Sequence, residues 1–386
     1  MKTMFKVSCV CALLATLAGF IPNTARAQGE SAVPFLLIAP NSRAAGIGET
    51  GTGSVDDASA VFWNPGALAF LDGQEVTLTH ANWLPQFGLS DLFYEYVNYR
   101  NRVDDIGGTL GASITYLNLG EFIRTSENGT ELGRFKAYEF AVTAGYSTKV
   151  FDDLGLGFNA RYIRSSLSPI GTGKEEGSGI ANTVSFDVAM MWRPFDLDVD
   201  WLDKKLSVGF NLSNLGPKVT YIDAAQADPL PTLLRLGLGY KIFEDEFNSL
   251  TYSVDFSRLL VRRRPEIKDT SGNVIQSASV DPLPKSLFTA WGDGSGLKKI
   301  NMSMGAEYWY GSPRLLAIRV GHFFEDPSFG NRNFWTFGAG LRYDIFGFDF
   351  SYISAAEGHP LSDTIRFSLL IGWGGASQAI SVPVPN

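Results

Sequence analysis

Apolar side chains recur at every second position over much of this chain, in windows of about eight to ten residues. In one window Tyr138, Phe140 and Val142 are apolar, whereas the alternating Glu139 and Thr143 are polar. A strand that crosses a membrane must be apolar at its lipid-facing positions, while the alternate positions can be polar. The pattern therefore predicts tilted, membrane-spanning β-strands.

The first residues predict export from the cytoplasm. Lys2 and Lys6 precede an apolar run that ends at Ile21, and small residues flank Arg26 as a signal peptidase requires. We expect residues 1–27 to be a signal peptide, which removes both cysteines, Cys9 and Cys11, and with them any disulfide or thiolate metal site. After Ile21 no apolar stretch approaches the roughly 20 residues of a spanning helix. The product is then either a soluble exported protein or a closed β-barrel in a membrane.

The number of windows in which every second residue is apolar distinguishes these two classes of protein. The apolar series of these windows begin at Val76, Leu92, Leu110, Tyr138, Leu156, Val184, Leu206, Leu234, Leu250, Ile300, Leu316, Trp335, Phe346 and Ile365. This gives about 14 strands, an even number as single-chain outer-membrane barrels require, whereas a soluble sandwich would have shorter strands with a polar outer phase. We predict an all-β, transmembrane antiparallel β-barrel over residues 73–373, located in the outer membrane. A net charge of −8 leaves no basic surface for nucleic acid.

The connections are expected to be short at the periplasmic end and long outside. Tight turns are predicted near Asp104, Asp152, Asp245, Ser312 and Asp344, with a longer connection around Asp198. Long outer loops are predicted around Asn128, Gly173, Asp223 and Asp326. The longest, of roughly 40 residues between Leu259 and Lys299, has no periodicity of its own and is the first place to expect recognition.

The inward phase predicts what fills the barrel. Its charged positions are Glu95, Glu139, Asp187, Asp255, Glu307 and Asp349 against Arg161, Arg235, Arg319, Arg342 and Arg366. Balanced charge favours paired groups in a filled lumen, the alternative being solvated groups in a water-filled channel. Many inward positions are glycine, which leaves space beside the wall. The non-alternating residues 28–72 are the candidate filler, an N-terminal plug.

Within residues 28–72, the string Asp56-Asp57-Ala58-Ser59 followed by Trp63-Asn64-Pro65 resembles the N-terminal hatch of the long-chain fatty-acid transporter superfamily of 14-stranded barrels. The run from Pro34 to Gly48, and the stretch from Glu139 to Leu167, are more similar to the PorV family of the bacterial type IX secretion system. The residues that match the plug motif are Arg43, Gly46, Gly48, Asp57, Trp63, Asn64 and Pro65.

This resemblance implies an outer-membrane barrel without chemistry of its own. PorV-type proteins accept cargo carrying a C-terminal β-sandwich signal domain at the giant translocon barrel and deliver it to a surface attachment complex with a sortase-like peptidase. The alternative is a transporter of fatty acids or other hydrophobic compounds. Such a transporter needs an apolar pocket, whereas the inward set is small or charged, which favours the shuttle. One feature departs from the family pattern: the last predicted strand does not end at the C-terminus, because a tail of residues 374–386 follows Trp373.

Three arginines, Arg262, Arg263 and Arg264, open the longest loop. They are candidates to contact either lipopolysaccharide phosphates or an acidic patch on cargo.

No enzyme motif has the required spacing. Gly173-Lys174 lacks the rest of a phosphate loop, and Gly294-Ser295-Gly296 is too short for a nucleophile elbow. The histidines, His80, His322 and His359, are scattered. We therefore expect no catalytic site, no metal site and no cofactor.

Overall fold

The computed structural model describes residues 31–374, except 89–90, 127, 169–177, 200, 224–225, 270 and 272. The predicted signal peptide 1–27, the loop around Gly173 and nearly all of the predicted tail 374–386 lie outside these residues. Within the described ranges, no helix has the length and apolarity to cross a membrane.

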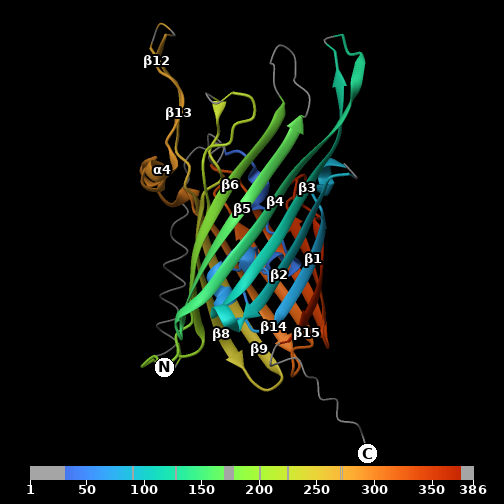
Figure 1. Ribbon diagram of the computed structural model, residues 1–386, viewed down its shortest axis with the longest axis vertical. Coiled ribbons are helices and arrows are strands. Elements are labelled where there is room, and N and C mark those ends of the chain that lie inside the picture. Colours follow the sequence, from blue (N-terminus) through green and yellow to red (C-terminus); the bar gives the residue numbers. More distant parts are fainter. Residues whose placement is uncertain are drawn as a thin grey trace, which may run out of the picture.

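Fourteen of the described strands close into an antiparallel barrel (Figure 1). Each pairs with the next strand of the wall, so that β9 pairs with β14, and β18 closes the barrel on β1. The strands of the wall are β1 (Gln74–Asn82), β2 (Phe93–Val103), β3 (Gly108–Thr125), β4 (Glu131–Phe151), β5 (Leu154–Ser168), β6 (Gly179–Trp192), β7 (Leu206–Leu215), β8 (Leu233–Glu244), β9 (Asn248–Leu259), β14 (Asn301–Tyr310), β15 (Leu316–Phe324), β16 (Asn333–Tyr343), β17 (Phe346–Ala355) and β18 (Ile365–Trp373). The predicted fold class is confirmed.

The two faces of the wall alternate as the sequence predicts. Val142, Phe186 and Ile318 are exposed on the outside, whereas the adjoining Thr143 and Asp187 are buried inside. An apolar outer band around a polar interior is the arrangement of an outer-membrane barrel.

In β2 the predicted phase is wrong. Tyr94 and Tyr96 point inward and are almost fully buried, in one cluster with Phe35 of the N-terminal region. Glu95 therefore lies on the outer face, where its carboxylate is 2.7 Å from Nδ1 of His80. The error arises because both phases of β2 contain aromatic residues, so alternation alone does not distinguish them.

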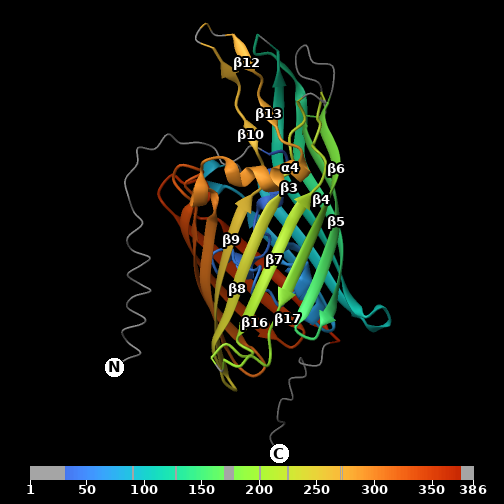
Figure 2. The same ribbon diagram turned by 90° about the vertical axis from the view of Figure 1, so that its left-hand side faces the viewer.

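Apart from the longer connection around Asp198, which was predicted, the connections at one end are short, and we take this end as periplasmic. The connection around Asn128 is not a long loop as predicted, because β3 and β4 continue as a hairpin far beyond the wall (Figure 1). The connection from Leu259 to Lys299 is long as predicted but not irregular. It contains β10 (Arg263–Arg264), β11 (Ile267–Lys268), β12 (Val274–Gln276), β13 (Ser279–Val280) and α4 (Leu283–Thr289), and it also projects outward (Figure 2).

Residues 31–72, called here the N-terminal segment, lie inside the barrel against the wall. They form the 3₁₀ helix η1 (Pro34–Leu37), the helices α2 (Ser42–Ala45) and α3 (Ala60–Trp63), and the 3₁₀ helix η2 (Pro65–Phe70). Inward glycines allow this close approach: a Cβ added to Gly209 would lie 1.8 Å from the Thr52 carbonyl oxygen, and one added to Gly305 would lie 2.4 Å from that of Ile47. The 3₁₀ helix η2 begins with Pro65, whose fixed φ suits a first helical position.

Candidate functional site

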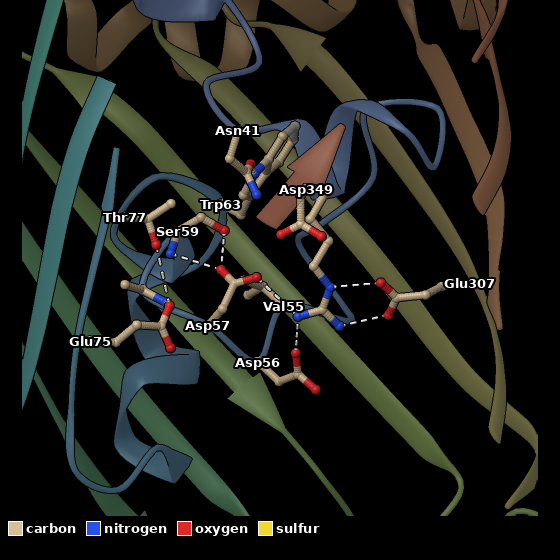
Figure 3. A network of polar contacts seen from close by, with 12 residues as sticks. Asn41, Val55, Asp56, Asp57, Ser59, Trp63, Glu75, Thr77, Glu307 and Asp349 are labelled. Atoms are coloured by element: carbon tan, nitrogen blue, oxygen red, sulfur yellow. Dashed lines mark hydrogen bonds and ion pairs between the residues drawn. The ribbon is translucent and has the colours of Figure 1, made fainter. Parts of the chain in front are cut away.

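The centre of the N-terminal segment is Arg43, which α2 directs toward strand β14. Its Nε and Nη2 atoms donate to the two carboxylate oxygens of Glu307 at 2.8 and 2.6 Å, a bidentate pair. Its Nη1 atom donates to Asp57 at 2.9 Å and also to Asp56. Figure 3 shows the three carboxylates converging on this one guanidinium. Arg43 thus joins two parts of the N-terminal segment to the barrel wall.

The network continues across the neighbouring strands. Glu307 also accepts from Arg319 at 2.7 Å, and Arg319 donates to Asp349 at 2.8 Å. Asp349 in turn accepts from Arg342 at 2.7 Å. The ring of Trp309 lies among these cations, with its centroid 5.2 Å from the guanidinium carbon of Arg319. Because the charges are paired, this side of the lumen has little net charge to attract an ion.

The second half of the plug motif makes neutral contacts. Trp63 Nε1 donates to Asn41 at 2.9 Å, and Asn64, which is fully buried, donates to the carbonyls of Thr52 at 2.8 Å and Met190 at 3.0 Å. Asn64 also accepts from the Gly66 amide at 3.0 Å. Asn64, which precedes Pro65, therefore both caps η2 and connects it to β6.

The remaining glycines and the proline of this motif pack directly on the wall. A Cβ added to Gly46 would lie 3.0 Å from the Cα of Gly338, and one added to Gly48 would lie 2.4 Å from the carbonyl oxygen of Met304. Pro65 lies against Gly157 in the same manner. Gly48 also has a φ of +77°, which favours glycine.

Most of the other predicted lumen charges face inward with partners. Arg161 pairs with Asp187 at 2.7 Å, and Asp255 accepts from the amides of Gly51 and Thr52 at 2.9 and 2.8 Å. Arg235 lies over the rings of Phe62 and Trp63, Arg366 is 3.7 Å from Glu49, and Glu139 accepts from Ser165 at 2.9 Å. Glu95 does not belong to this set, as its position on the outer face shows.

One inward pair was missed from the sequence. Arg100 of β2 donates to Glu75 of β1 at 3.1 Å, and Glu75 accepts from the Ala58 amide at 2.8 Å. Assigning the opposite phase to β2 would have found it, since Arg100 shares the phase of Tyr94 and Tyr96.

A cavity of about 650 Å³ lies at the outer end of the lumen. Its apolar lining includes Leu37, Trp83, Phe323, Phe329 and Leu361. These side chains come largely from the N-terminal segment and the outer connections. The inference that disfavoured a transporter considered the inward strand positions alone, and these other segments add apolar side chains to the lumen.

Polar groups lie at the rim of this outer cavity. Glu325 accepts from Arg332 at 2.8 Å, and burial together with the nearby Arg332 lowers the pKa of His359. A second cavity, of about 560 Å³, opens at the periplasmic end and is lined by polar residues, including Arg43 and Asp56. The N-terminal segment lies between the two.

The three arginines of the long outer connection each pair with a carboxylate. Arg262 lies 3.8 Å from Asp293, Arg263 contacts Asp228 of the β7–β8 connection, and Arg264 donates to Asp281 at 3.1 Å. The hydrogen bond from Arg264 holds the pKa of Asp281 well below its ordinary value. Arg263 thus joins two outer connections, whereas the pairs of Arg262 and Arg264 lie within the long one.

Within the described residues, no three or more His, Cys, Asp or Glu side chains come together as a metal site. The histidines stand apart, with His80 beside Glu95 on the outer face and His322 beside Asn333.

A family model described as type IX secretion system protein PorV matches residues 22–266. The chain belongs to the PorV family. No curated protein sequence is similar to it. Like other members of the PorV family, it is an outer-membrane β-barrel.

Three solved structures are similar to the PorV-family chain. The toluene transporter TodX of Pseudomonas putida is 12% identical, with 91% of this chain and 99% of that chain covered and a TM-score of 0.49. The toluene transporter TbuX of Ralstonia pickettii is also 12% identical, with 86% and 98% covered and a TM-score of 0.48. A FadL homologue of Pseudomonas aeruginosa is 14% identical, with 86% and 98% covered and a TM-score of 0.44.

Proposed function

We propose that this protein is a cargo shuttle of type IX secretion. It would bind exported proteins that carry a C-terminal signal domain at the giant translocon barrel and deliver them to the sortase-like attachment complex at the cell surface. Membership of the PorV family is the observation that carries this proposal.

The extracellular end offers the surface that such a task needs. The β3–β4 hairpin and the connection containing β10 to β13 both extend well beyond the barrel wall (Figure 2). An ion pair from Arg263 links the second of these to the β7–β8 connection, and one from Arg264 to Asp281 lies within it. A folded cargo domain would be held between ordered projections.

The interior supports an external rather than an internal route. The N-terminal segment lies in the lumen and is fastened to the wall by Arg43, Asn64 and the backbone contacts at the inward glycines. We propose that it acts as a plug, so that cargo stays outside the lumen.

The decisive experiment is purification of the tagged protein from outer membranes in mild detergent. We expect secreted proteins that share one C-terminal domain to co-purify with it, together with the translocon. The control is a variant with residues 271–276 replaced by a short Gly-Ser turn, which should remain a heat-modifiable, folded barrel but capture less cargo, since loops tolerate deletion. Absence of any shared C-terminal domain among the co-purified proteins would refute the shuttle.

Transport of a hydrophobic compound is the second candidate, and the outer cavity favours it. A volume of about 650 Å³ with a partly apolar lining is within the range of small-molecule sites. Under this alternative, protein purified in the same way would lack cargo and retain a lipid or other apolar molecule, detected by mass spectrometry of an organic extract. The Phe329→Ala variant should then lose that molecule, whereas cargo capture should not depend on it.

A further inference from the structure

Strand β6 continues outward past the end of its neighbour β7. The β6–β7 ladder runs from Trp192↔Val208 to Phe186↔Leu215 and ends there. Asn214 adopts a φ of +61°, and Gly216 lies against the carbonyl of Val184, just below the unpaired part of β6. On its other side β6 stays paired with β5 as far as Gly179. Residues 179–183, called here the outer β6 edge, therefore have a strand partner on one side only among the described residues.

The outer β6 edge lies on the extracellular side of the wall. Val184, directly below it, is paired with Tyr162, one of the aromatic residues at the outer end of the lipid-facing band. In an antiparallel ladder, alternate residues direct both the N–H and the C=O to the same side. Every second residue of the edge thus presents its backbone groups away from β5.

Composition distinguishes this edge from others at the same end of the barrel. Natural edge strands are blunted by charged residues or proline, which oppose pairing with another chain. The β4 edge beyond Tyr138 contains Glu131, Arg134 and Lys136. The outer β6 edge reads Gly-Ile-Ala-Asn-Thr, without charge or proline. It is thus an unprotected template for a β-strand.

The side chains of the edge point to the same conclusion. Ala181 faces inward in the buried cluster that holds Val219 and Leu230, so the inner face of the edge is already packed. Asn182 faces outward and accepts from Tyr162 at 2.7 Å, which holds the outer face in place. The hydroxyl of Thr183 is buried and without a hydrogen-bond partner.

We propose that the outer β6 edge binds an extended strand of the exported cargo's C-terminal signal domain by β-augmentation. This inference rests on the proposed function and identifies where and how cargo is held. Backbone hydrogen bonds would supply most of the affinity, since the edge offers no charged group for recognition. Such a mode suits a carrier of many cargoes, because backbone groups are common to all sequences.

The test uses the full-length protein in detergent and, as probe, the isolated C-terminal domain of an exported protein identified in the co-purification. Ile180→Lys places a charge on the outward face of the edge and away from the lumen, and should weaken binding by about tenfold or more. Leu132→Lys, the matched control, adds the same charge to the already charged β4 edge and should leave affinity unchanged. Amide hydrogen exchange at residues 180–183 should slow when the domain binds.

Two results would overturn the proposal while leaving the shuttle intact: normal binding by Ile180→Lys, or unchanged exchange at 180–183 on binding. Equal losses in Ile180→Lys and Leu132→Lys would also reject the edge as the site. Protection that rises with protein concentration in the absence of the domain would assign the edge to a second copy of this chain. Failure of wild-type protein to bind any such domain would refute the edge and the shuttle together.

Discussion

Replacing Arg43 by methionine should destabilise the protein far more than an ordinary ion-pair deletion. Arg43 and its carboxylates Asp57 and Glu307 are all at least nine-tenths buried. Without the guanidinium, Glu307 keeps Arg319, but Asp57 keeps only its hydrogen bonds from Ser59 within the described residues. Removing one partner of a buried pair costs about 3–5 kcal/mol, because the other charge stays buried and uncompensated.

The assay is equilibrium urea unfolding in liposomes, from which the change in free energy of unfolding is obtained directly. Arg134→Met is the matched control: Arg134 also contacts two carboxylates, Glu121 at 3.0 Å and Glu131 at 2.9 Å, but in the exposed hairpin. Solvent screens that arrangement, so its loss should be hardly measurable.

A second variant separates lost charge from lost packing. Arg43→Met combined with Asp57→Asn neutralises the orphaned carboxylate and should recover part of the lost stability. If Arg43→Met unfolds at the same urea concentration as Arg134→Met, the N-terminal segment does not depend on this network, and the reasoning is wrong.

Three further predictions concern other parts of the molecule. Val142→Arg places a charge on the lipid face and should cost about 2–4 kcal/mol in urea unfolding, whereas Leu132→Arg, outward but above the membrane, should cost little. Gly321→Ala would bring a Cβ to 2.0 Å from the Gly48 amide, so single-channel recordings should show raised ion conductance as the N-terminal segment shifts, while Gly292→Ala, with nothing within 4 Å, should not. Arg264→Gln should return the pKa of Asp281 toward its ordinary value and speed amide exchange in α4 at neutral pH. Because a depressed carboxyl pKa stabilises the fold only above that pKa, the difference in exchange from wild type should vanish as the pH falls through it. A difference that does not change with pH would contradict this origin.

The barrel could be predicted from the sequence because lipid imposes one rule on every strand. An apolar residue such as Val142 or Phe186 is required at each outward position whatever lies inside. The rule gave the wrong phase for β2 because the N-terminal segment buries Tyr94 and Tyr96 on the inner side, where other strands have polar groups. The packing of the lumen, not the membrane, decides the inner phase.

The partners of Arg43 could not be predicted in the same way. Asp57 is close in the chain, but Glu307 is 264 positions away, and only the closed barrel brings β14 to α2. The inward glycines predict that another segment lies close to the wall, but they do not predict which residues come into contact. The outer cavity was missed for a related reason, since its apolar lining comes from segments that have no periodicity to read.

The contacts of the N-terminal segment with the wall also impose an order on biogenesis. During export Arg43 emerges well before Glu307, its counterion on β14, and the barrel closes only when β18 meets β1. The segment joins β1 through a short link and touches strands around the wall, from β6 through Asn64 to β14 through Arg43. We therefore expect the segment to dock while the sheet is still open, before the β1–β18 seam closes around it. The barrel would then be inserted as a curved sheet wrapped around this segment, not as an empty cylinder filled afterwards.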